Sequence, residues 1–205
     1  MKRLITAVFV AASAMASTGC GPGTVTGVLP TRTGPPAPAE ATLVWVGFGE
    51  CERLENGAWV RRPEFDYEFT VEQRRYADHW ESVKHMRRRH PGYDGSAGPR
   101  EQTFHFNLEM GTPAGETLPI RITSTLGPGE GQADRAFRRA SLVFHPDISA
   151  FAPFDTYRIA QTYGYETGLL EETVSLDKGE SPWVRNQEKA TLFSAHTFSS
   201  PPTTR

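Results

Sequence analysis

The chain lacks the features that define several familiar classes of protein. Only two of its 205 residues are cysteine, which excludes a disulfide-rich scaffold. Lys and Arg number 22 against 24 Asp and Glu, and without a basic excess we expect no nucleic-acid partner. No apolar run reaches the roughly 20 residues that a membrane-spanning helix needs. The sequence has no HExxH motif, no Cys/His cluster and no phosphate-binding GK[ST], so we predict neither a metal site nor any other cofactor.

What is present at the N-terminus has the pattern of an export signal. Two basic residues precede a short apolar run, and small residues follow up to Cys20. The last four of these residues, 17–20 (STGC), resemble the lipobox of bacterial lipoproteins. The resemblance implies that residues 1–19 are a signal peptide and that Cys20 begins the mature chain with a diacylglyceryl group on its sulfur. The alternative is an ordinary secretory signal that is cut after Ala16.

The resemblance also implies a location and one partner. Two or more acyl chains, such as palmitate, hold a protein stably on a membrane, so we expect a lipid-anchored protein of the bacterial cell envelope. In enteric bacteria this family keeps proteins with Asp after the lipidated Cys in the inner membrane. Here the residue is Gly21, which implies the outer membrane.

The anchor and the folded domain are separated by a segment that cannot form a core. Residues 21–41 contain four Gly and five Pro, so we predict that 20–41 comprise the lipidated Cys and a disordered tether. The rest divides into a single globular domain over 42–199 and a disordered tail over 200–205.

Alternation of apolar and polar residues predicts a domain made mainly of strands. Residues 42–48 (TLVWVGF) are nearly all apolar and indicate a strand buried on both faces. Asn56-Gly57 is a strong hairpin signal, and a two-residue turn there pairs Leu54 with Trp59 and Glu52 with Arg61. Gly-rich 127–131 is expected to be a loop, and Pro119 suggests that its strand lies at an edge. Further strands are expected at 65–71, 103–110, 118–126, 139–145, 157–165, 170–176 and 189–198.

One segment has helical spacing instead. Tyr76, Trp80 and Val83 share one helical stripe, which predicts a helix over 71–89 that packs on the sheet, with Arg88 on its solvated side. The fold class is therefore α+β with a mostly antiparallel β-sheet. A sandwich, a partly open barrel and a sheet that grips the one main helix are all compatible with it.

Few residues suggest a catalytic or metal-binding role. Cys51 is expected to be a buried, inert thiol, because no adjacent base is evident. On a helix Glu81 and His85 would share a face, and with His105 they would offer three metal ligands, but solvated side chains explain them better. Arg87 to His90 are expected to be the solvated end of the helix.

These observations favour a non-catalytic module that binds an apolar ligand or an envelope protein, using some of the 22 aromatic residues to line a cavity. No catalytic residue is assigned. The alternatives are an envelope hydrolase that uses the Glu81/His85 region and a purely structural interaction partner. A binder should show an apolar cavity without clustered titratable groups, whereas an enzyme should show several such groups around one cleft.

Overall fold

The computed structural model describes residues 40–146, 154–179 and 181–197. The expected signal peptide, Cys20, nearly all of the tether and the C-terminal tail lie outside these residues. The described part contains eleven strands and one short 3-10 turn, Pro63–Phe65. The strands are β1 (Ala41–Glu55), β2 (Ala58–Arg61), β3 (Tyr67–Arg75), β4 (His79–Arg87), β5 (Glu101–Met110), β6 (Thr117–Ser124), β7 (Gly129–Asp134), β8 (Arg139–Phe144), β9 (Thr156–Gly164), β10 (Leu169–Lys178) and β11 (Ser181–Thr197).

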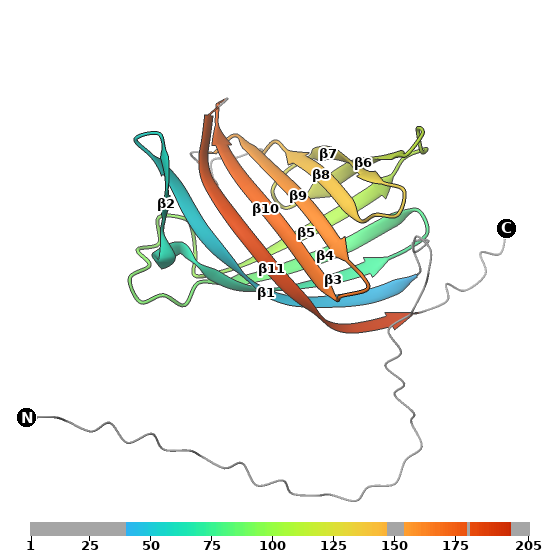
Figure 1. Cartoon of the computed structure of the whole chain (residues 1–205), viewed down its shortest axis with the longest axis horizontal. Helices are drawn as coiled ribbons and strands as arrows, with labels where there is room; N and C mark the ends of the chain where they lie inside the picture. The colour runs from blue at the N-terminus through green and yellow to red at the C-terminus, as the bar shows by residue number, and fades with distance from the viewer. Residues whose placement is uncertain (1–39, 147–153, 180, 198–205) are drawn as a thin grey trace, which may run out of the picture.

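The strands form a closed antiparallel barrel (Figure 1). Of the eleven strands, β2 pairs only with β1, so the other ten circle the barrel. The ring closes where β1 pairs with β11, from Ala41 opposite Thr197 to Arg53 opposite Val184. Closure gives every strand of the ring two partners, so among the described strands only β2, outside the ring, has an unpaired edge.

The expected α+β fold with a main helix at 71–89 is therefore wrong. This segment holds the end of β3, the turn at 76–78 and β4, and the described residues contain no α-helix. The inward positions of the two strands carry polar residues such as Gln73, Arg75 and Ser82 among the apolar ones. These polar residues hid the period of two, and the spacing of Tyr76, Trp80 and Val83 resembled a helical stripe by coincidence. No helix among the described residues is long and apolar enough to cross a membrane.

The predicted hairpin is confirmed. Leu54 lies opposite Trp59 and Glu52 opposite Arg61, and the turn residues Asn56 and Gly57 have φ angles of 51° and 82°. Positive φ at both central residues is what a type I′ turn requires. Glu52 and Arg61, however, do not form an ion pair with each other and have other ionic partners.

The guanidinium of Arg61 binds Asp66, with Nη1 2.5 Å from Oδ1, and lies 3.4 Å from Glu50. Glu52 instead pairs with Arg185 on β11, at 2.6 Å. The turn therefore fixes the backbone register of the hairpin, while neighbouring strands supply the ionic partners.

Most of the remaining strand predictions are confirmed, with three corrections. The 42–48 strand is buried on one face only, because Phe48 is 50% exposed on the outside. β6 lies between β5 and β7, so Pro119 is not on an edge strand. The 127–131 segment is only partly a loop, because β7 begins at Gly129. A Cβ at Gly131 would lie 2.4 Å from the carbonyl oxygen of Ser141, so glycine is needed where β7 and β8 approach each other.

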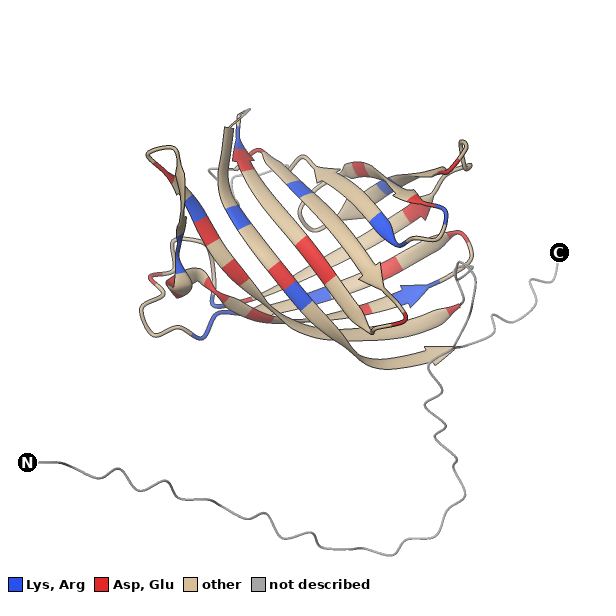
Figure 2. Cartoon of the chain, in the orientation of Figure 1, with Lys and Arg blue, Asp and Glu red and all other residues tan. Residues whose placement is uncertain are grey.

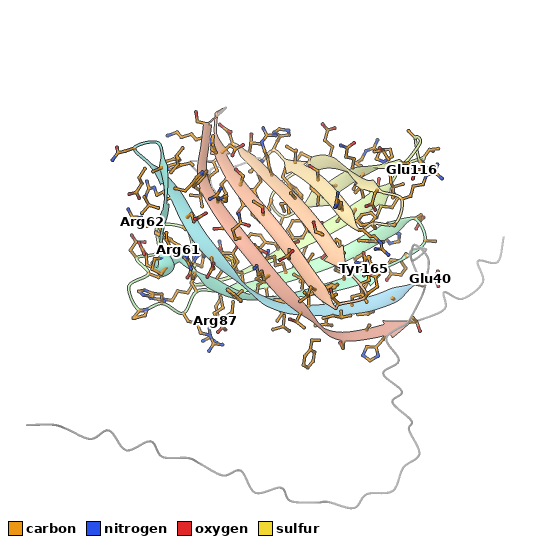
Figure 3. All side chains as sticks on the ribbon, in the orientation of Figure 1. Glu40, Arg61, Arg62, Arg87, Glu116 and Tyr165 are labelled. Carbon is orange, nitrogen blue, oxygen red and sulfur yellow. The ribbon has the colours of Figure 1, made fainter. Side chains whose placement is uncertain are left out.

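Aromatic rings and one arginine fill the end of the barrel near the β3–β4, β7–β8 and β9–β10 turns. The guanidinium of Arg75 lies 3.8 Å from the centre of the Trp80 ring, and Trp80 lies 3.8 Å from Phe137. Tyr163 stacks on Tyr165 at 5.4 Å, and Figure 3 labels Tyr165 at this end. Nη1 of Arg75 donates to the Tyr165 hydroxyl at 2.9 Å. This aromatic cluster closes one end of the interior.

Candidate functional site: a cavity inside the barrel

The barrel encloses a cavity of about 320 Å³. Small-molecule sites in proteins have volumes of roughly 300–1,000 Å³, so the cavity suits a small ligand. Most of its wall is apolar, with contributions from every strand of the ring except β6 and β7. The apolar lining includes Val71, Met86, Phe104, Phe106, Leu108, Leu142, Phe144, Ile159 and Val174. At the end away from the aromatic cluster, Phe65, Phe154 and Trp183 continue the lining.

Charged residues are interspersed along the strands (Figure 2), and three of them meet inside the barrel. Lys84 on β4 forms an ion pair with Glu188 on β11, and its Nζ lies 3.5 Å from Oε2 of Glu172 on β10. Glu172 and Glu188 are direct cross-strand neighbours. Two further side chains complete this charged cluster, because the Tyr67 hydroxyl donates to Glu188 and the Gln161 amide donates to Glu172.

Burial sets the protonation of the charged cluster. Burial raises the pKa of Glu172 to about 8, and the neighbouring Glu188 adds to this while Lys84 opposes it. Burial would also raise the pKa of Glu188, but the charge of Lys84 and three hydrogen bonds bring it below its ordinary value. Burial would lower the pKa of Lys84, yet the two carboxylates raise it overall. At neutral pH the cluster therefore holds one cation, one carboxylate and one protonated carboxyl group.

The structure does not bring Glu81 and His85 together. Both lie on β4 with exposed side chains on the outside of the barrel. Four residues along a strand span roughly 13 Å, whereas four residues on a helix would have placed the side chains side by side. His105 is exposed on β5 opposite Val83. Among the described residues no group of three His, Cys, Asp or Glu is arranged to hold a metal ion.

The other two residues singled out in the sequence point inward. Cys51 is buried at 5% exposure, and burial, with the nearby Asp66 carboxylate, raises the pKa of its thiol to about 12. This environment fits the expected inert thiol. Arg88 was expected to be solvated, but it is only 8% exposed and lines the cavity. Its neighbour Arg87 points away from the barrel (Figure 3), as alternation along an extended chain requires.

The charged cluster was not found from the sequence, although one of its members left a signal there. Glu172 stands between Leu170 and Val174 on the inward face of β10, where the alternation demands an apolar residue. A charge in such a position must find a partner inside the fold. The helical interpretation of its segment hid the signal of Lys84. Glu188 lies on β11 one residue before the strand predicted over 189–198.

No protein-family model matches the chain, and no curated protein is similar to it. The cavity combines both features named above, an apolar wall and clustered titratable groups. In the charged cluster each titratable group is bonded to another member or to Tyr67 or Gln161. Groups that are paired with one another in this way stabilise a polar interior.

Proposed function

We propose that the protein is a lipid-anchored envelope protein whose barrel binds a small, mainly apolar ligand in its interior cavity. The observation that carries this proposal is the cavity of about 320 Å³, whose wall is mainly apolar and includes Phe, Leu, Ile and Val side chains. Removing an apolar ligand from water contributes roughly 25 cal/mol for each Å² that is buried. The charged cluster supplies a few polar groups in this wall, as is usual in ligand sites.

A carrier function accounts for the internal neutralisation of the charged cluster better than catalysis does. A general acid or base must reach the reacting atom with a free proton or lone pair. Glu172 and Glu188 instead accept hydrogen bonds from Gln161 and Tyr67 and share the charge of Lys84. Their arrangement holds three strands together across the barrel and leaves the apolar wall as the binding surface.

The test is a titration of the whole protein with the neutral apolar probe N-phenyl-1-naphthylamine, whose fluorescence rises in apolar surroundings. Val174 is buried at 3% exposure and lines the cavity, so Val174→Phe should fill it and weaken binding at least tenfold. Leu169→Phe on the same strand is the control, because Leu169 is 48% exposed on the outside. The proposal fails if the wild type does not bind the probe, or if the two folded variants bind it equally.

The anchor is tested separately. Metabolic labelling with a fatty-acid analogue should mark the wild-type protein in the membrane fraction, and Cys20→Ala should be neither labelled nor membrane-bound. An unlabelled wild-type protein in the soluble envelope fraction would refute lipidation and leave ligand binding open to its own test.

A further inference from the structure

Arg88 occupies an unusual position at the cavity wall. It follows the last residue of β4, its backbone N–H donates to the carbonyl of Arg100 at 2.8 Å, and its side chain is only 8% exposed. Its guanidinium lies 5.0 Å from the centre of the Tyr93 ring and 6.0 Å from that of Tyr67. Nη1 donates to the Pro99 carbonyl at 3.1 Å and to Oε1 of Gln102 at 2.9 Å. The aromatic rings and these two acceptors fix the orientation of the side chain.

The other edge of this guanidinium has no partner among the residues that the structure describes. Nε is buried without a hydrogen bond, Nη2 makes none with any described residue, and no described carboxylate lies within ion-pair distance. Nε and Nη2 form one of the edges that bind a carboxylate with two parallel hydrogen bonds. A buried donor without an acceptor costs about 1–3 kcal/mol, and more when it is charged. An anion that binds Nη2 and shifts the side chain enough to reach Nε would remove this penalty.

The charge balance of the interior singles out Arg88. Lys84 is paired with Glu188, and Glu172 is mainly protonated at neutral pH because burial raises its pKa. Arg75 is also buried, has no ion pair with a described residue and has an unpaired Nε, but its Nη1 and Nη2 donate to Tyr165 and Gln73 and it does not line the cavity. Arg88 is thus the buried cation of the cavity wall that the described residues leave without a counter-ion and with two unused donors.

A second polar group lies within reach of the same end of the cavity. Tyr157 lines the cavity, and its hydroxyl makes no hydrogen bond with a described residue. Burial raises the pKa of Tyr157, and the charges of Glu188 and Arg88 act on it in opposite directions. The hydroxyl therefore stays protonated at neutral pH and is a second hydrogen-bond donor in the cavity wall.

We propose, on the basis of the carrier function above, that the ligand is a small organic acid whose carboxylate binds Nε and Nη2 of Arg88 and whose apolar body enters the cavity. A planar carboxylate matches the two parallel donors of the edge. A phosphate monoester carries more charge and more oxygens, and Arg88 and Tyr157 together do not offer enough donors for it. The apolar lining around Phe104 and Leu142 receives the rest of the molecule.

The experiment compares ligands that differ only in the head group. Octanoate, 1-octanol and octyl phosphate are competed against N-phenyl-1-naphthylamine on the wild-type protein at pH 7.5. We expect octanoate to bind at least tenfold more tightly than 1-octanol and octyl phosphate. Arg88→Gln should lower the affinity for octanoate at least tenfold more than it lowers the affinity for 1-octanol.

Two further variants make the result interpretable. Arg87→Gln is the control, because Arg87 is exposed and pairs with Glu101 outside the barrel. Arg88→Lys keeps the charge and loses the two-donor edge, so it should also weaken octanoate binding. It is used in place of Arg88→Gln if Arg88→Gln does not fold. Equal binding of octanoate and 1-octanol, tighter binding of octyl phosphate, or no effect of Arg88 variants would overturn the inference. Retained binding of the neutral probe would in each case leave the carrier function standing.

Discussion

At the scale of single residues, the interior of this barrel is defined by side chains that break the expected pattern. Gln73, Lys84, Glu172 and Glu188 all occupy inward positions that alternation reserves for apolar residues. Their identities can be read in the sequence, but their partners cannot, because Lys84 lies 104 residues from Glu188. Which charges neutralise one another is a property of the closed ring, and for this reason sequence analysis found an apolar core and missed the charged cluster.

The raised pKa of Glu172 predicts how stability depends on pH. Burial raises this pKa from 4.5 to about 8, so folding takes up a proton between these values and stability falls as pH rises through them. One such proton gives a slope of at most about 1.4 kcal/mol per pH unit. Glu172→Gln cannot take up the proton, so its stability should change less between pH 5 and 9.

The measurement is chemical unfolding of the wild type and the variant at several pH values in that range. Glu188, whose pKa is lowered, stays ionised there and contributes no opposing slope. Glu171→Gln is the control, because Glu171 is adjacent in sequence but exposed on the outer face. Equal slopes for the wild type and Glu172→Gln would show that Glu172 is ionised in the folded protein.

At the scale of elements, the sequence predicted strands well where one face was uniformly apolar. Phe104, Leu108, Leu142 and Leu170 all point inward as alternation requires. The prediction failed at β4, whose inward residues are Trp80, Ser82, Lys84 and Met86, so that half of them are polar. Local spacing cannot distinguish a strand of this composition from a helix. The pairing of β4 with β3 and β5 makes this segment a strand. Such pairing joins different segments of the chain, so the local spacing of residues does not show it.

Adjacent residues on β4 should therefore respond in opposite ways to truncation. Trp80 is 2% exposed and packs against Phe137 and Arg75, so Trp80→Ala should cost about 3–5 kcal/mol of unfolding free energy. Glu81 is exposed on the outer face, so Glu81→Ala should cost at most about 0.5 kcal/mol. Urea unfolding followed by circular dichroism measures both. Similar losses for the two variants would contradict the strand alternation.

At the scale of the whole molecule, closure joins the first long strand to the last. β1 and β11 pair along thirteen positions, with one bulge at Val44/Trp45, although they are separated by most of the described chain. The sequence signals for both strands were evident, but nothing local shows that they meet. An open sheet, a sandwich and a closed barrel can all be built from the same strands, which explains why closure could not be predicted.

One glycine makes the closing seam possible and provides a test of it. A Cβ at Gly47 would lie 2.2 Å from the Lys189 carbonyl oxygen and 2.7 Å from Cα of Ala190, both in the backbone of β11. Gly47→Ala must therefore push β11 away from β1, at a cost of about 1–3 kcal/mol, or roughly 2–10 °C in melting temperature. Hydrogen exchange should show faster exchange of the paired amides of β1 and β11.

Gly57→Ala is the control for Gly47→Ala, because it strains the backbone away from the pairing of β1 with β11. Gly57 has a φ of 82°, so alanine there costs about 1–2 kcal/mol locally, but a Cβ would meet no atom within 4 Å. Because β2 pairs only with β1 and lies outside the ring, fraying of the hairpin relieves this strain without opening the barrel. The amides of the seam should therefore keep wild-type exchange rates in Gly57→Ala. If Gly47→Ala also left those rates unchanged, the pairing of β1 with β11 would not be what closes the molecule.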